Sequence, residues 1–111
     1  MNYHNRKFRP ISNSENGKVS VDMVFHYLQY GNVLTCTYHG QHILKGQLIG
    51  WVDKDGKIDM RYQQVNRQGE MMTGVCQSSP EITVDGKIRL HEKWRWTSGD
   101  LSNGNSVLEE I

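Results

Sequence analysis

Cysteine and proline are both scarce in this sequence, with two of each among 111 residues. Cys36 and Cys76 are too few for a disulfide framework and too far apart for a CxxC motif, so we expect two buried free thiols, with a single cross-barrel disulfide as the alternative. Neither sign of charge is in excess, because thirteen basic and twelve acidic residues leave a net charge of +1. Since there is no basic excess, we expect no nucleic-acid partner.

Long hydrophobic runs are absent as well. No apolar stretch approaches the length of a transmembrane helix, so we expect no membrane association. The first ten residues carry positive charge, but no apolar segment of the kind found in secretory signals follows them. We therefore expect a cytoplasmic protein. Because a chain of this length forms one core, we also expect a single β-barrel domain over 1–111.

The common catalytic and cofactor motifs are missing too. No glycine-rich phosphate loop leads into a helix, so a nucleotide or acetyl-CoA would have no helix N-terminus to bind. No Ser or Cys stands in a nucleophile elbow. His39 and His42 flank a turn at Gly40, where their imidazoles would diverge, and a metal site needs further ligands. We predict no catalytic residue, no cofactor and no metal site.

Turn signals, by contrast, are abundant. Gly, Asn and Asp reach positive φ at low cost, as tight hairpin turns require. Between these signals, polarity alternates with a period of two, which is typical of strands with one buried and one solvated face. The signals are Gly31-Asn32, His39-Gly40, Asp55-Gly56, Gln68-Gly69, Asp85-Gly86 and Asn103-Gly104. The predicted strands are 3–11, 20–30, 33–39, 42–52, 57–65, 70–77, 87–97 and 105–111.

This pattern predicts an all-β fold, a single up-and-down antiparallel barrel of about eight strands. Closure would remove both exposed edges of the sheet. A helix from Val19 to Tyr30 competes with the strand 20–30, but the Val, Phe and Tyr content favours the strand. The segment Ser78-Ser79-Pro80 is expected to end the sixth strand before the seventh begins.

Seven side chains are candidates for a ligand site inside the barrel. Alternation places polar groups on the same strand faces as apolar and aromatic ones, and such a mixture is typical of a small-molecule pocket. It is equally typical of a filled barrel whose interior polar groups satisfy one another. The candidates are Tyr38, Tyr62, Gln64, Thr73, Glu92, Trp94 and Trp96.

Glu92 breaks the apolar pattern of its strand face. A buried carboxylate is costly unless it is paired or hydrogen-bonded. The residue would either orient a ligand or act as a general acid or base, or else be structural, held by an interior ion pair or by a hydrogen bond to Tyr62 or Tyr38. The two nearby tryptophans pose a similar choice between core filling and a stacking platform. The basic row from Lys87 to Arg95 is interpreted as a solvated outer face, paired with acidic residues.

Four segments resemble a family of small bacterial proteins often labelled N-acetylglutamate synthase. They are Leu48-Ile49-Gly50, 58–62, Met72-Thr73-Gly74 and 86–100, the last being the most specific. The resemblance covers nearly the whole chain. It implies a compact β-barrel similar in shape to lipocalins, avidin and fatty-acid-binding proteins, a calycin-type fold. The label implies acetyltransferase activity, but the resemblance assigns no catalytic residue.

Three functional hypotheses follow. The leading one is a non-enzymatic barrel that binds a small, partly apolar ligand. The alternative is a structural or protein-interaction barrel, filled inside, that self-associates through its outer face or an edge. We expect a monomer or a homodimer. The third, an N-acetyltransferase, rests on the family label. A cavity of about 300 Å³ or more would favour the ligand.

Overall fold

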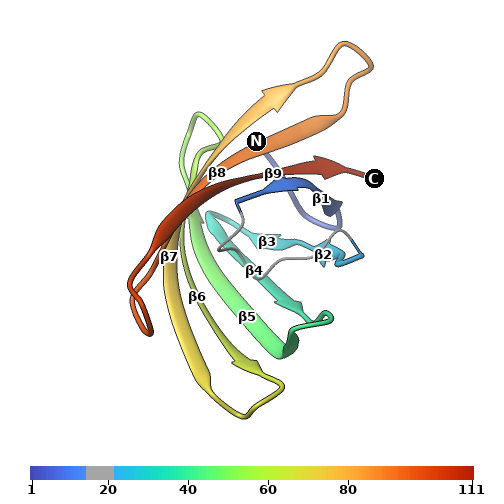
Figure 1. Ribbon diagram of the computed structural model, residues 1–111. Coiled ribbons are helices and arrows are strands. Elements are labelled where there is room, and N and C mark those ends of the chain that lie inside the picture. The colour runs from blue at the N-terminus through green and yellow to red at the C-terminus, as the bar shows by residue number, and fades with distance from the viewer. Residues whose placement is uncertain (15–21) are drawn as a thin grey trace.

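Nine strands form one antiparallel sheet in the computed structural model of the protein, which describes residues 1–14 and 22–111. They are β1 (Lys7–Asn13), β2 (Phe25–His26), β3 (Leu28–Tyr30), β4 (Val33–Tyr38), β5 (Ile43–Val52), β6 (Ile58–Asn66), β7 (Met71–Ile82), β8 (Ile88–Trp96) and β9 (Asn103–Glu110). Their order in the sheet is β2-β1-β9-β8-β7-β6-β5-β4-β3 (Figure 1). The described residues contain no helix, and so none that could span a membrane. The all-β prediction is confirmed.

The segment that carries β2 and β3 nearly closes the sheet into a barrel. β2 pairs with β1, whereas β3 pairs with β4 at the other end of the strand order. Between β2 and β3, the Tyr27 N–H donates to the Arg6 carbonyl, and the Tyr27 carbonyl accepts from the Asn5 N–H. Counted as one interrupted strand, 25–30 completes the barrel of about eight strands that the sequence predicts. The competing helix is not formed over 22–30, and the rest of the predicted strand, up to residue 21, lies outside the described residues.

The predicted break at Ser78-Ser79-Pro80 is wrong, because β7 continues through it to Ile82. The register supplies the reason. β6 begins at Ile58, opposite Ser78, so residues 79–82 pair with β8 alone and form a short edge. A proline is tolerated at an edge, where its missing N–H need not serve a second neighbour.

The predicted turns are mostly confirmed. Gly31, Gly56, Gly69 and Gly86 all adopt positive φ between adjacent strands. Gly104 is different, because it lies inside β9 rather than in a turn.

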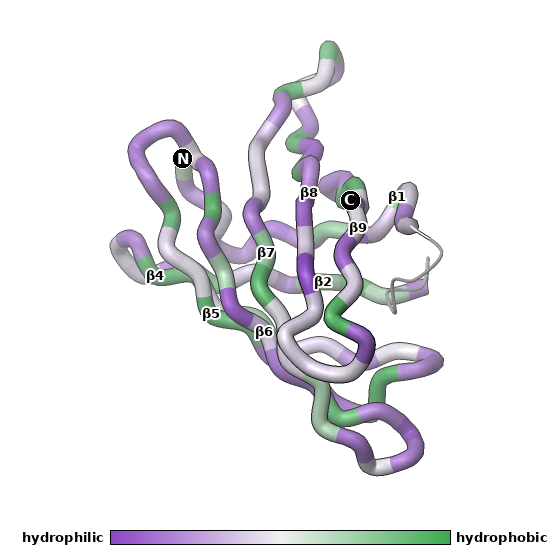
Figure 2. The backbone as a smooth tube through the Cα atoms, turned by 60° about the vertical axis from the view of Figure 1, so that its left-hand side comes forward, coloured by the Kyte–Doolittle hydropathy of each residue, from purple (hydrophilic) through white to green (hydrophobic). Residues whose placement is uncertain are grey.

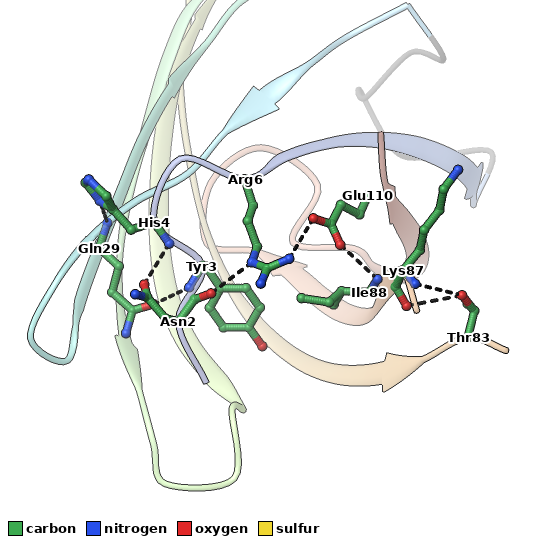
Figure 3. Close-up of polar contacts among 9 residues, drawn as sticks. All are labelled: Asn2, Tyr3, His4, Arg6, Gln29, Thr83, Lys87, Ile88 and Glu110. Carbon is green, nitrogen blue, oxygen red and sulfur yellow. Dashed lines mark hydrogen bonds and ion pairs between the residues drawn. The ribbon is translucent and has the colours of Figure 1, made fainter. Parts of the chain in front are cut away.

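The N-terminal segment closes one end of the barrel, which is why the predicted strand 3–11 begins only at Lys7. Tyr3 is fully buried, and its hydroxyl donates to the Gly56 carbonyl in the turn between β5 and β6. Arg6 forms an ion pair of 2.8 Å with Glu110, whose carboxylate also accepts a backbone N–H of β8 (Figure 3). These contacts fix residues 3–6 across the ends of several strands.

Inward-facing and outward-facing side chains alternate along the strands, and hydropathy varies along each one (Figure 2). The outer face of β8 carries the basic row that the sequence shows. Arg89 forms an ion pair of 3.0 Å with Glu109 on β9, and His91 contacts Glu81 on β7 at 2.7 Å. These pairs agree with the interpretation of this row as a solvated outer face.

Candidate functional site

A cavity of about 60 Å³ lies inside the barrel, away from the N-terminal segment. Residues from the C-terminal parts of β4, β6 and β8 line its walls. Tyr3, by contrast, contacts the turn that precedes β6, at the other end of that strand. The volume exceeds the ~10–15 Å³ that one water needs. It is smaller than the size that would by itself favour a ligand. The lining residues are Asn13, Phe25, Tyr27, Tyr38, Leu48, Met60, Tyr62, Gln64, Cys76, Glu92, Trp94, Trp96, Ser106 and Leu108.

Six of the seven candidate residues line this cavity; Thr73 does not. The predicted position of Thr73 inside the barrel is wrong, because Gly74 lies opposite Tyr62 in the β6–β7 register and faces inward. Thr73 therefore faces outward, where its hydroxyl lies 2.7 Å from that of Thr97. The structure thus brings together Tyr38, Tyr62, Gln64, Glu92, Trp94 and Trp96.

Sequence reasoning missed several lining residues. Cys76 shares its face of β7 with Gly74, but both faces of this strand carry apolar residues, so alternation could not identify the inner face. Ser106 lies opposite Glu92 in the β8–β9 register, which no sequence pattern reveals. Tyr27 falls between β2 and β3, in a segment where helix and strand competed.

Three lining aromatic rings lie against glycines of a neighbouring strand. A Cβ added at Gly46 would overlap the Tyr38 ring, and one at Gly74 would overlap the Tyr62 ring. Trp94 covers Gly104 in the same way, with its ring 2.5 Å from the position of an added Cβ. Because glycine has no side chain, each ring can lie along the barrel wall instead of extending into the centre. This arrangement explains how so many large side chains leave a cavity.

The lining rings also fix one another. Trp96 makes edge contacts with Tyr62, at 5.4 Å between ring centroids, and with Trp94, at 6.1 Å. The Tyr38 hydroxyl donates to Gln64 Oε1 at 3.1 Å. Edge-to-face geometry at these separations is the preferred arrangement for aromatic pairs. The cavity wall is therefore held in place by packing and not only by the sheet.

Glu92 lies at the inner end of the cavity, since Leu90, the next inward residue of β8, is fully buried and does not line it. The Ser106 hydroxyl donates to Glu92 Oε1 at 3.0 Å, and the Cys76 thiol forms a second hydrogen bond. Among the described residues, the predicted hydrogen bond from Tyr62 or Tyr38 to Glu92 is not formed. Within residues 1–14 and 22–111, no ion pair joins Glu92 to a basic side chain.

Burial raises the pKa of Glu92 to about 7, against the lowering effect of the Ser106 and Cys76 hydrogen bonds. Its side chain keeps some exposed surface because it borders the cavity, but the protein encloses the carboxyl closely enough to disfavour its charge. The carboxyl can therefore gain or lose a proton near neutral pH. In its protonated form the carboxyl can hydrogen-bond to a molecule in the cavity, and in its ionised form it can also form an ion pair with one.

Three buried polar atoms that line the cavity or lie opposite Glu92 have no hydrogen-bond partner among the described residues. They are the Tyr27 hydroxyl, Gln64 Nε2 and the Ser78 hydroxyl. Tyr27 and Gln64 line the cavity, and Ser78 lies opposite Glu92 in the β7–β8 register. Buried polar atoms are nearly always satisfied in native proteins, so this concentration requires an explanation.

The thiols and histidines form no further site. Cys36 and Cys76 are buried free cysteines, as predicted, and burial raises the pKa of Cys36 to about 12. In the part of the chain that the structure describes, no three His, Cys, Asp or Glu side chains gather where they could hold a metal ion.

Comparison with known proteins agrees with this geometry. A family model described as avidin-like protein matches residues 1–111. The chain belongs to the avidin-like protein family. Neither the curated proteins nor the solved structures that were compared gave a match. Membership of the avidin-like family and the nearly closed barrel both agree with the predicted calycin-type fold. Neither supports the N-acetylglutamate synthase label.

Proposed function

We propose that this avidin-like protein binds a small molecule inside its barrel and performs no chemistry on it. One observation carries the proposal: unsatisfied polar groups concentrate around the cavity. The Tyr27 hydroxyl and Gln64 Nε2 lack partners among the described residues, and Glu92 has no basic partner there. A filled barrel would gain stability by pairing these groups or replacing them with apolar ones. A ligand that pairs with them explains why they are present.

The cavity volume of about 60 Å³ limits the ligand, or the part of it that enters, to a small group. The aromatic walls favour a partly apolar molecule, and the carboxyl and amide at the cavity favour one that also carries hydrogen-bonding groups. No catalytic role is proposed for Glu92. The expected cytoplasmic location stays a prediction.

Native mass spectrometry of the protein purified from its own host tests this proposal. We expect a bound mass that is lost when the protein is unfolded and refolded in clean buffer. The variant Glu92→Gln should carry less of that mass, whereas the outer-face variant Glu81→Gln should carry as much as the wild type. Absence of any bound mass, combined with failure of the refolded protein to bind any small molecule at the cavity, would contradict the proposal.

Self-association is a second candidate function, favoured by apolar side chains on the outer face. Tyr30, Val33 and Trp51 lie in register across β3, β4 and β5, with exposed fractions of 68%, 39% and 57%. Contiguous exposed apolar residues of this kind are typical of protein interfaces. The same native mass spectra report the number of subunits. We expect a homodimer that Trp51→Glu converts to a monomer, and a wild-type monomer at micromolar concentration would exclude this function.

A further inference from the structure

The charge of the cavity indicates the charge of its ligand. Among the described residues that line it, none is Lys, Arg or His, and Glu92 is the only carboxylic acid. The other titratable lining groups are hydroxyls and a thiol, which are either neutral or negative. No basic side chain lines the cavity to balance a Glu92 carboxylate, so a positively charged ligand is favoured there over an acidic one.

The walls offer a second source of attraction for a positive charge. Six aromatic side chains line the cavity: Phe25, Tyr27, Tyr38, Tyr62, Trp94 and Trp96. The face of an aromatic ring is electron-rich and attracts organic cations, most strongly when the cation is shielded from water. Tyr38, Tyr62 and Trp94 lie against cross-strand glycines, so their rings form part of the cavity wall.

The position of Glu92 completes the arrangement. It lies at the inner end of the cavity with a serine opposite it on each side, Ser78 on β7 and Ser106 on β9. Glu92 and Ser106 both line the cavity, so the carboxyl is accessible from it.

We infer that the ligand is a small organic cation, an alkyl ammonium whose charged group lies at Glu92 and whose alkyl part lies among the aromatic rings. The inference rests on the proposed function, since it names the chemical class of the molecule bound at the same site. The cation would replace the missing partner of the carboxylate and donate its N–H groups to Glu92. The small cavity favours a compact, branched alkyl group over a long chain.

Binding of such a cation should depend on pH. Other titratable groups face Glu92 from the elements packed around it: Tyr27, Tyr38 on β4, Tyr62 on β6 and Cys76 on β7. Burial raises the pKa of all four, so they stay neutral up to pH 9. Glu92 alone changes charge in this range, and a cation prefers its ionised form. Affinity should therefore rise between pH 5.5 and pH 8.5, with release of a proton from Glu92 at the lower pH values.

Three compounds of nearly equal shape test the inference on the refolded wild-type protein. They are tert-butylammonium, neutral tert-butanol and anionic pivalate. Binding is followed by NMR of the tryptophan indole N–H groups, because Trp94 and Trp96 line the cavity while Trp51 is exposed on the outer face and serves as an internal control. We expect saturable shifts at Trp94 and Trp96 with tert-butylammonium at an affinity at least tenfold above that for tert-butanol, and none with pivalate.

The variant Glu92→Gln should abolish the preference for the cation, and Glu81→Gln should retain it. Equal or tighter binding of tert-butanol or pivalate to the wild type would overturn the inference and leave the proposed binding function intact. No saturable shift with the cation would also overturn it. A neutral or acidic molecule that copurifies from the host would also overturn the inference. If none of the three compounds binds and no molecule copurifies, the proposed binding function is contradicted as well. The comparison of the three compounds on the wild-type protein tests the preference for a cation even if Glu92→Gln does not fold.

Discussion

Replacement of Glu92 by glutamine should stabilise the ligand-free protein, and increasingly so as the pH rises. The ordinary glutamate pKa is 4.5, and burial raises that of Glu92 to about 7. Between these values the folded protein holds a proton that the unfolded chain has released. The free energy of unfolding therefore falls as the pH rises through this window, by about 3 kcal/mol in total at ~1.4 kcal/mol per pKa unit.

Glutamine carries no charge to desolvate and keeps one oxygen to accept the Ser106 hydrogen bond. The gain in the free energy of unfolding should be smaller than the full cost of the buried charge, because the Glu92 side chain is partly exposed to the cavity. The glutamine amide also brings a donor that needs a partner. The expected stabilisation is about 2 kcal/mol at pH 8.5 and less than about 1 kcal/mol at pH 5. In a domain of this size, 2 kcal/mol corresponds to about 5–10 °C in melting temperature.

Thermal melts of the refolded proteins, followed by circular dichroism from pH 5 to pH 8.5, measure this difference. Glu81→Gln is the matched control, since it removes a carboxylate from the outer face, and its melting temperature should differ from the wild type by a nearly constant amount above pH 7. A difference in melting temperature between Glu92→Gln and the wild type that does not change with pH would contradict a raised pKa of Glu92. A loss of stability of ~3–5 kcal/mol in Glu92→Gln at pH 8.5 would also contradict this prediction, because a loss of that size marks a broken buried ion pair.

Three further predictions concern the walls of the cavity and the thiols. Gly74→Ala places a methyl group inside the Tyr62 ring, so the free energy of unfolding from urea titration should fall by ~1–3 kcal/mol, and an unchanged value would show that the ring moves freely. Tyr27→Phe removes a buried hydroxyl without a partner in the described residues, so stability in urea should be equal or higher; a loss above ~1 kcal/mol would reveal a hydrogen bond to that hydroxyl. Burial raises the pKa of Cys36 to about 12 and that of Cys76 further, so neither thiol should react with Ellman's reagent at pH 8 until guanidinium is added. Reaction of either thiol within minutes in the folded protein would contradict this.

The candidate site shows where sequence patterns stop being informative. The faces of β6 and β8 follow from strict alternation, so Tyr62, Gln64 and Glu92 could be placed inside the barrel from the sequence. β7 has apolar residues on both faces, Met71 and Val75 on one and Met72 and Cys76 on the other, and alternation alone could not choose between them. The pairing of β7 with β6 determines which face is buried. It places Gly74 opposite Tyr62 on the inner face, so Thr73 lies on the outer face.

The all-β class, most of the strand limits and the anomalous position of Glu92 follow from the sequence alone, because turns and alternation are local properties of the chain. The surroundings of that carboxyl follow only from the way the strands pack in the folded barrel. Hydrogen bonds from Ser106 and Cys76, and aromatic rings that lie against cross-strand glycines, depend on register between segments far apart in the sequence. Register sets which side chains meet across a barrel, and since a shift of one residue reverses every face, no pattern within a single strand can specify it.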